Sequence, residues 1–268
     1  MNFSEQIVAP DFAMPGMHLV AASAGTGKTY SIQTLYLRLV MVEGLAVQQI
    51  LVVTFTKAAT KELKERLQKV LREALDFQND ATPNPDERIV EMAALAEAKA
   101  VDRKMAVSRL AQALLDFDLA AIYTIHGFCQ RMLGRFAFET GQPFDAEPSE
   151  ASDAEIVERC RDWWRANVVA AGAAQPGFGL TQLVLFAKRL VAKPDAVLDD
   201  AGPLAQAAEA IARDYRAGRA ASRSVTFDDY LLNLRQALRE DGPEGPLHAA
   251  LRTEFHAALI DEFQDTDP

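Results

Sequence analysis

The chain has 268 residues, of which 49% are hydrophobic and 25% charged, and its formal net charge is −10. This length can bury a sizeable core, and the balance is that of an ordinary soluble protein of one large domain or two small ones. Its two cysteines lack the spacing of a disulfide framework or a zinc site, and neither a membrane span nor a signal peptide is visible, so we expect a cytoplasmic protein.

The first predicted unit is a strand, a glycine-rich loop and a helix. Residues 18–22 form a short apolar run, and the loop that follows reads ASAGTGKT, which fits G-x-x-x-x-G-K-[ST] with Ala22 in place of the first glycine. Glycines in such a loop let several backbone N–H groups point at one phosphate, and the helix that starts near Lys28 adds its positive end. The pattern therefore predicts an ATP-phosphate site, with Lys28 on the β- and γ-phosphates and Thr29 on Mg²⁺. The predicted binding residues are Ala24, Gly25, Thr26, Gly27, Lys28 and Thr29. The alternative is a chance turn of small residues that only caps the helix.

Residues 50–55 (ILVVTF) predict a second, buried strand, and an amphipathic helix follows it. This helix carries a basic strip against only two acidic residues: Lys57, Lys61, Lys64, Arg66, Lys69 and Arg72. The acidic balance of the whole chain counts against nucleic-acid binding, but phosphate contacts act locally under salt screening. A basic strip can therefore bind phosphates on an acidic protein.

The rest of the chain is predicted to be mostly helical. We expect a loop over 79–87, one or two helices over 88–115, a strand over 119–124 and a helix over 126–138. Residues 140–148 break the pattern, helices resume to about 251, and a last apolar strand covers 257–261. This order predicts an α/β fold, a parallel sheet with an inserted helical subdomain.

An acidic pair ends the last predicted strand. Asp261 suits a Mg²⁺ ligand, and Glu262 suits a residue that orients or deprotonates the attacking water. Alone, such a pair is more typical of a solvated strand end. The phosphate loop upstream favours the catalytic interpretation.

Four segments together resemble helicase motifs I, Ia, Ib and II of superfamily 1, the UvrD/Rep type, in order and spacing. They are residues 22–29 (ASAGTGKT), 54–59 (TFTKAA), 124–129 (TIHGFC) and 260–268 (IDEFQDTDP). The residues within these motifs are most similar to those of the RecB type, the exodeoxyribonuclease V beta subunit. The resemblance implies a RecA-like P-loop NTPase fold. It divides the chain into the first part of helicase domain 1A (1–148), a helical insert like domain 1B (149–225) and a return to domain 1A with motif II (226–268).

The same resemblance implies roles for single residues. Lys28 and Glu262 would be catalytic, Gln264 would link the γ-phosphate to motion, and Gln6 would read the adenine edge. Single-stranded DNA would contact a set at the strand tips: Thr54, Phe55, Lys57, Thr124 and His126. For most of these residues a purely structural role is the alternative.

In those alternatives, Phe55 lies in the core, His126 makes a structural hydrogen bond at a helix start, and the threonines are caps. Gln264 is then an exposed turn residue, and Gln6 part of a polar N-terminus. Trp163 and Trp164, beside two arginines, suit helix packing better than DNA stacking.

The resemblance implies an ATP- and Mg²⁺-dependent DNA helicase subunit that acts on single-stranded DNA and DNA ends beside sister subunits. The chain stops just after motif II, so we expect a piece of a longer motor, with weak hydrolysis by itself. One competing hypothesis is a P-loop ATPase or kinase of another class. Another is a non-catalytic module that binds DNA or partners.

Overall fold

The computed structural model describes residues 7–9, 11–20, 28–81, 84–136, 147–148, 153–170, 176–192, 202–222, 224–225 and 227–263. The chain forms two compact units, Met1–Phe128 with Asp241–Pro268, and Cys129–Glu240. The second unit is thus inserted in the sequence of the first. None of the helices in the described ranges is long and apolar enough to cross a membrane.

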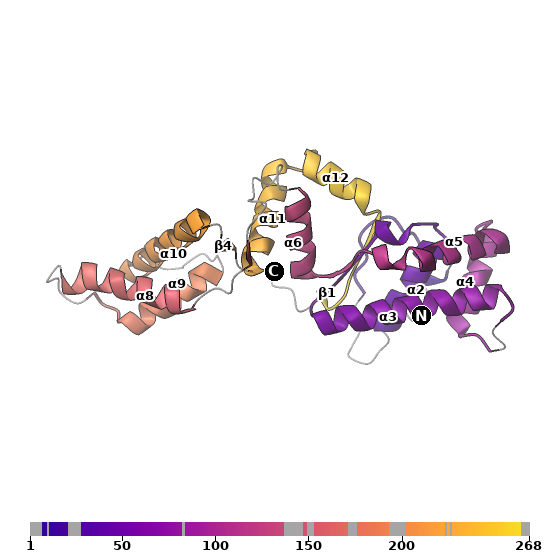
Figure 1. Ribbon diagram of the computed structural model, residues 1–268, viewed down its shortest axis with the longest axis horizontal. Coiled ribbons are helices and arrows are strands. Elements are labelled where there is room, and N and C mark those ends of the chain that lie inside the picture. The colour runs from indigo at the N-terminus through magenta and orange to yellow at the C-terminus, as the bar shows by residue number, and fades with distance from the viewer. Residues whose placement is uncertain are drawn as a thin grey trace. The chain divides into compact units, whose positions relative to one another are not determined.

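The first unit is built on a small parallel sheet (Figure 1). Its strands are β1 (Ile50–Thr54), β2 (Ile122–Thr124) and β5 (Ala257–Ile260), in the order β2-β1-β5. Both pairings are parallel, with Thr54 opposite Thr124 and Val53 opposite Ile260. The structure therefore confirms an α/β arrangement with a parallel sheet, although helices dominate the chain.

The central strand β1 is buried on both faces. Ile50 and Val52 belong to the main apolar core, whereas Leu51 and Val53 belong to a smaller cluster on the other face. This division follows the period-two alternation of strand side chains. A continuous apolar run is what a parallel strand covered on both sides requires.

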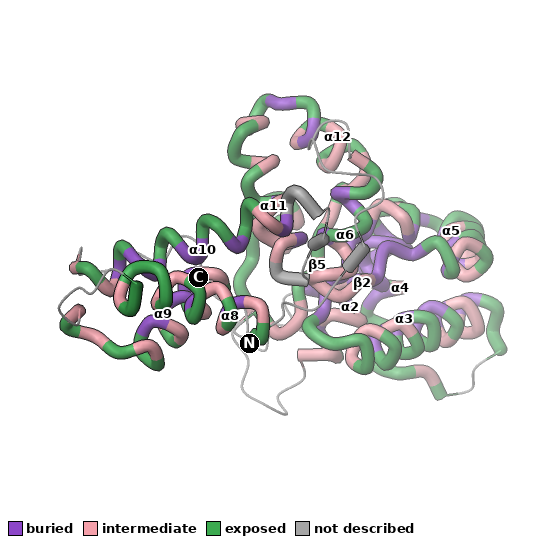
Figure 2. Tube along the Cα trace, turned by 60° about the vertical axis from the view of Figure 1, so that its left-hand side comes forward, coloured by how far each residue is buried: buried purple, intermediate pink, exposed green. Residues whose placement is uncertain are grey.

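Several helices of the first unit contribute residues to this core. They are α2 (Lys28–Met41), α3 (Lys57–Gln78), α4 (Glu87–Ala98) and α5 (Arg103–Leu115), with short 3₁₀ turns at Val47–Gln49 and Phe117–Leu119. Helix α12 (Pro246–Glu254) precedes β5 in the chain. Along α3, Leu63, Leu67 and Val70 are buried, and Figure 2 shows buried turns alternating with exposed ones. Helical spacing thus puts the apolar residues inward and the basic ones outward.

One predicted strand is wrong in its described part. Residues 18–20 form no strand, and Leu19 is 80% exposed. A strand needs a paired neighbour as well as apolar residues, and no ladder hydrogen bond reaches this described stretch. The predicted strand over 119–124 is shorter than expected, because residues 117–119 form the 3₁₀ turn.

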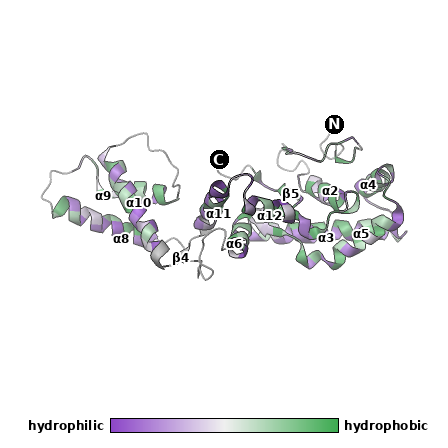
Figure 3. Ribbon diagram, turned by 90° about the horizontal axis from the view of Figure 1, so that it is seen from above, coloured by the Kyte–Doolittle hydropathy of each residue, from purple (hydrophilic) through white to green (hydrophobic). Residues whose placement is uncertain are grey.

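The second unit has its own core. Its elements are β3 (Glu147–Pro148), α8 (Asp153–Trp164), a π-helical turn (Arg165–Val169), α9 (Leu180–Ala192), α10 (Pro203–Ser222) and β4 (Ser224–Val225), with α6 (Ile125–Arg135) and α11 (Phe227–Asp241) at the ends. Each of α8, α9 and α10 mixes hydrophobic and hydrophilic residues along its length (Figure 3). Trp163 and Trp164 lie 6.4 and 6.0 Å from the Phe178 ring and pack on this core, which confirms the packing interpretation.

Candidate functional site

Three parallel strands end at the same edge of the sheet and bring predicted site residues together there. Thr124 is the register partner of Thr54, and the Asp261 N–H donates to the Val53 carbonyl at 2.9 Å. Thr124, Thr54 and Asp261 therefore lie on neighbouring strands at their carboxyl ends. In open parallel sheets this edge is where ligands bind.

The first turn of α2 reaches the same edge. Lys28, the first residue of α2, has its Nζ 3.6 Å from Oε2 of Glu262, and both side chains are partly exposed. Glu262 has φ of 52°, a left-handed conformation that costs a residue with a Cβ about 1 kcal/mol. This turn after β5 directs the second acid toward the lysine. Predicted residues Gln6, Ala24–Gly27 and Gln264 lie outside the described residues.

Asp261 lies in a partly buried position at the end of β5. Burial raises the pKa of Asp261, and the neighbouring Glu262 charge raises it further. The Glu262 N–H, which donates to Asp261 Oδ1 at 3.0 Å, and the Lys28 charge act in the opposite direction. A nearby cation therefore favours the charged form of this carboxylate.

The residues at this edge suit a nucleotide and its metal ion. A lysine ammonium and a helix start suit phosphate, whereas the Thr29 hydroxyl and the Asp261 carboxylate are oxygen ligands of the kind Mg²⁺ prefers. Over the described ranges, no group of three or more His, Cys, Asp and Glu side chains could hold a metal. A metal that takes one or two protein oxygens and completes its shell with phosphate and water fits this edge best.

The predicted DNA-contact residues differ in their exposure. Thr54 is fully buried, and its hydroxyl lies 2.5 Å from the Thr60 hydroxyl and donates to the Thr56 carbonyl. Phe55 is 48% exposed, and Lys57 is exposed at the start of α3. Thr54 thus fixes the turn from β1 into α3, while the next residues face outward.

The second predicted DNA segment begins α6. Thr124 Oγ1 accepts from the Gly127 N–H at 3.1 Å, as a helix cap does. A Cβ on Gly127 would lie 3.0 Å from that oxygen, so the small residue preserves the cap. His126 is half-buried within the same first turn. The capping alternative therefore describes part of the role of Thr124.

A polar cluster beside the site was missed by the sequence analysis. Tyr30 donates to Asp86 Oδ1 at 3.1 Å, and the Arg88 guanidinium lies 4.5 Å from the Tyr30 ring centre. An acidic residue after Asn84-Pro85 signals a helix cap, which Asp86 is. Its contact with Tyr30 spans 56 residues, and no local pattern predicts such a pairing.

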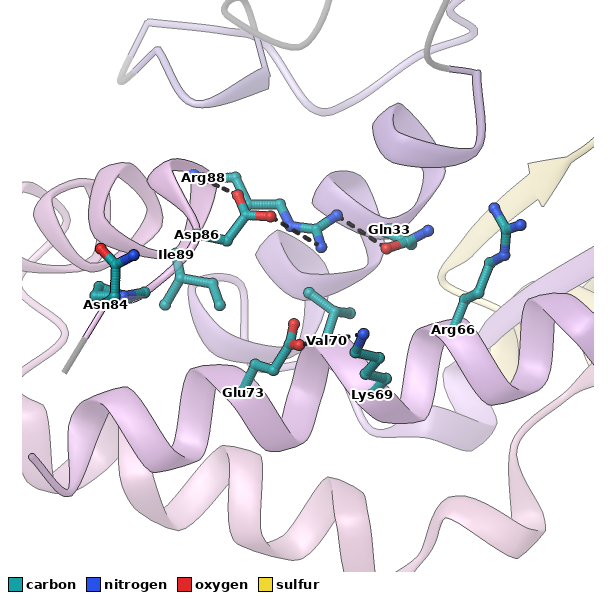
Figure 4. A pocket seen from close by; sticks show the side chains of 10 residues that line it. Gln33, Arg66, Lys69, Val70, Glu73, Asn84, Asp86, Arg88 and Ile89 are labelled. Atoms are coloured by element: carbon teal, nitrogen blue, oxygen red, sulfur yellow. Dashed lines mark hydrogen bonds and ion pairs between the residues drawn. The ribbon is translucent and has the colours of Figure 1, made fainter. Parts of the chain in front are cut away.

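A cavity of about 570 Å³ lies next to this cluster, between α3 and the start of α4 (Figure 4). Its cations are paired with carboxylates: Lys69 with Glu73 at 3.6 Å, Arg88 with Asp86 at 3.4 Å, and Arg66 with Glu62. Paired cations leave little excess positive charge for a phosphate. The edge near Lys28 is therefore the better phosphate site.

The first unit is thus an α/β arrangement in which Lys28, Asp261 and Glu262 meet at the carboxyl edge of a parallel sheet. Residues 3–268 match the family described as UvrD/REP helicase N-terminal domain. The chain belongs to this family.

Relatives include RecBCD enzyme subunits RecB from several bacteria. The chain is 40% identical to that of Escherichia coli K12 over 164 residues, 58% of this chain and 13% of the relative. It is 31% identical to that of Mycobacterium tuberculosis CDC 1551 over 261 residues, 93% of this chain and 23% of the relative. The chain thus spans less than a quarter of the length of these relatives.

Proposed function

We propose that this chain is the ATP-binding N-terminal motor domain of an ATP-dependent DNA helicase–nuclease subunit of the RecB type. It would couple ATP hydrolysis to movement on single-stranded DNA in double-strand-break repair and recombination. The observation that carries the proposal is the convergence of Lys28, Asp261 and Glu262 at the carboxyl edge of one parallel sheet. RecB relatives aligned over up to 93% of the chain support it.

In this proposal each edge residue has one task. Lys28 holds the β- and γ-phosphates, Thr29 and Asp261 hold Mg²⁺, and Glu262 orients and deprotonates the attacking water. Mg²⁺ would supply neutralisation of the charge that develops on the phosphates. Glu262 also contacts Lys28, so a bound γ-phosphate would compete with the carboxylate for the ammonium. Gln6 and Gln264 complete the proposed set.

The proposed architecture is a RecA-like domain with an inserted helical subdomain, divided at 1–148, 149–225 and 226–268. A compact unit over 129–240, whose sequence interrupts the sheet-bearing unit, supports an insert of this kind. Its described core is formed by helices α8, α9 and α10.

The proposed DNA path follows the strand tips and the start of α3. Phe55 offers an exposed ring for base stacking, and Lys57 offers a charge for a phosphate. Thr54, Thr124 and His126 would shape this surface by fixing the two turns. Partners would be DNA ends and the sister subunits of a cytoplasmic helicase–nuclease complex.

The test is Mg-ATP binding by calorimetry, for wild type and Lys28→Ala, with and without a short single strand of DNA. We expect binding that requires Lys28 and changes with DNA. Binding that requires Lys28 but ignores DNA would favour another class of P-loop enzyme. Unchanged binding by a folded Lys28→Ala protein, or none by folded wild type, would contradict the proposal.

Hydrolysis gives a second test. Glu262→Gln should leave ATP binding intact and lower any hydrolysis, because the amide cannot accept the proton of water. The matched control is Glu97→Gln, an exposed position near the end of α4. A Glu262→Gln protein that is folded but does not bind ATP would show that Glu262 is not the base.

A further inference from the structure

The start of α4 is fastened to the first two turns of α2. Asp86, the N-cap of α4, accepts from the Arg88 N–H and also from the Tyr30 hydroxyl, each at 3.1 Å. Burial, and then the Asp86 charge, raise the pKa of Tyr30 to about 12, so the hydroxyl keeps its proton at neutral pH. One carboxylate therefore serves as a helix cap and as a tether to α2.

Arg88 makes the second attachment. Its side chain is 9% exposed, its Nη1 donates to Gln33 Oε1 at 2.9 Å, and its Nη2 lies 3.4 Å from Asp86 Oδ2. The guanidinium also covers the Tyr30 ring. Figure 4 shows Arg88 directed from α4 toward Gln33 of α2. A planar guanidinium with several fixed donors suits such a bridge better than a lysine would.

The bridge acts on the turn that carries the phosphate-binding residues. Tyr30 follows Lys28 and Thr29 directly, and Gln33 lies one turn further along α2. Ile32 of the same turn packs on the main core, whereas Gln33 and Arg88 line the cavity on the α4 side. On that side, hydrogen bonds contribute to the orientation of the first turn.

We propose that Asp86, Arg88 and Tyr30 are positioning residues that hold the first turn of α2, and with it Lys28, in the orientation that receives the nucleotide phosphates. This inference rests on the proposed role of Lys28. It assigns a function to the segment between α3 and α4, which lies outside the four helicase-like motifs. The groups proposed to act on the nucleotide remain Lys28, Asp261 and Glu262.

The opposite end of α2 supplies a matched control. Arg109 of α5 donates from Nη1 to the carbonyls of Met41 and Val42, at 2.9 and 2.7 Å. Arg88 and Arg109 are thus two arginines that fasten the same helix, one near Lys28 and one at its far end. A purely structural role would make their replacements equivalent for nucleotide binding.

The experiment measures Mg-ATP and Mg-ADP affinity of the 268-residue chain by calorimetry, at a temperature where each variant is folded by circular dichroism. The variants are Arg88→Gln, Tyr30→Phe, Arg109→Gln and Lys28→Ala. We expect Arg88→Gln to weaken ATP binding about tenfold and Tyr30→Phe about fivefold, the size of one net hydrogen bond. ADP affinity should fall less, because the lysine also contacts the γ-phosphate.

Arg109→Gln should lower the melting temperature and leave both affinities unchanged. The inference is overturned if Arg109→Gln weakens ATP binding as much as Arg88→Gln does. It is equally overturned if Arg88→Gln and Tyr30→Phe both bind ATP like wild type while Lys28→Ala does not. Should Arg88→Gln fail to fold, Tyr30→Phe decides alone, because it removes one hydroxyl from a partly exposed ring. Unchanged ATP affinity in Lys28→Ala would instead overturn the proposed function itself.

Discussion

The neighbouring strands β1 and β5 run in the same direction and differ in surroundings. All five residues of β1 are buried, whereas burial in β5 alternates and Ile260 is 50% exposed. Within the described residues β5 pairs on one side only, with β1. The acidic pair Asp261 and Glu262 follows the half-exposed strand β5. The exposed Phe55 follows the fully buried strand β1.

This difference separates the residues that stabilise the first unit from the residues of its proposed site. The core under β1 stabilises the fold through apolar burial. Because protein cores are closely packed, the removal of even a few atoms there lowers the stability. β5 instead pairs with β1 along its length and packs only Ala257 and Leu259 on that core. It is preceded by α12, which starts beside a close contact at Gly245, and is followed by the left-handed turn at Glu262. Changes under β1 should therefore cost more stability than changes in the segments before and after β5.

The largest effect is expected under β1. Leu67 of α3 is fully buried in the same cluster as Ile50 and Val52, so Leu67→Ala should cost about 2–5 kcal/mol of unfolding free energy. Urea unfolding measures it. The control is Leu115→Ala, since Leu115 is 80% exposed and its loss should change stability by less than about 0.5 kcal/mol. Equal losses at the two positions would contradict the assigned core.

The next effect lies upstream of β5. A Cβ on Gly245 would stand 2.1 Å from Cγ and 2.3 Å from the main-chain oxygen of Asp241. Gly245→Ala must therefore displace the start of α12, at a cost of about 1–3 kcal/mol. Gly134→Ala is the control, because a Cβ there meets nothing within 4 Å in a helix and should stabilise by about 0.5–1 kcal/mol. If both variants were stabilised in thermal unfolding, the close contact at Gly245 would be refuted.

Some of this organisation was predictable from the sequence, and the reasons differ between segments. The apolar runs of β1 and β5 and the start of the helix at Lys28 follow from local patterns. The run at 18–20 looks equally strand-like, but pairing depends on a neighbouring strand and not on the run itself. Long-range polar contacts, such as Tyr30 with Asp86, carry no local signal. The direction of a side chain is equally hidden, so the sequence alone leaves both a DNA contact and a cap open for Thr54, whose side chain is buried in the structure.

A smaller effect is expected at the turn after β5. Glu262 has φ of 52°, which glycine adopts without strain, so Glu262→Gly should be more stable than Glu262→Ala by about 1 kcal/mol. Thermal unfolding of the two variants compares them directly. Both should lose hydrolysis, because both lack the carboxylate. An alanine variant as stable as the glycine variant would show that the turn relaxes on substitution.

The smallest effect is a pH dependence upstream of β5. Burial acts to raise the pKa of Asp241, but hydrogen bonds from the His248 main chain and ring and from the Leu247 N–H outweigh it and lower the pKa. The distances to Asp241 Oδ2 are 3.0 Å from the His248 N–H and 3.2 Å from its Nδ1. The unfolded chain therefore takes up the proton at higher pH than the folded chain does. The stabilisation is complete above the unfolded pKa and is lost as pH falls through the lowered folded pKa.

Asp241→Asn should remove this dependence. Melting temperatures of wild type and Asp241→Asn, measured from pH 7 down to pH 3, should differ most at neutral pH and converge in acid. Asp118→Asn is the control, because its carboxylate is almost fully exposed and its pairing with Lys64 is screened by water. A constant gap between wild type and Asp241→Asn would mean that the Asp241 charge does not stabilise the start of α12. Asp241 would then stabilise the start of α12 through packing against Gly245 and not through its charge. The segment before β5 would in that case be stabilised by packing, as the core under β1 is.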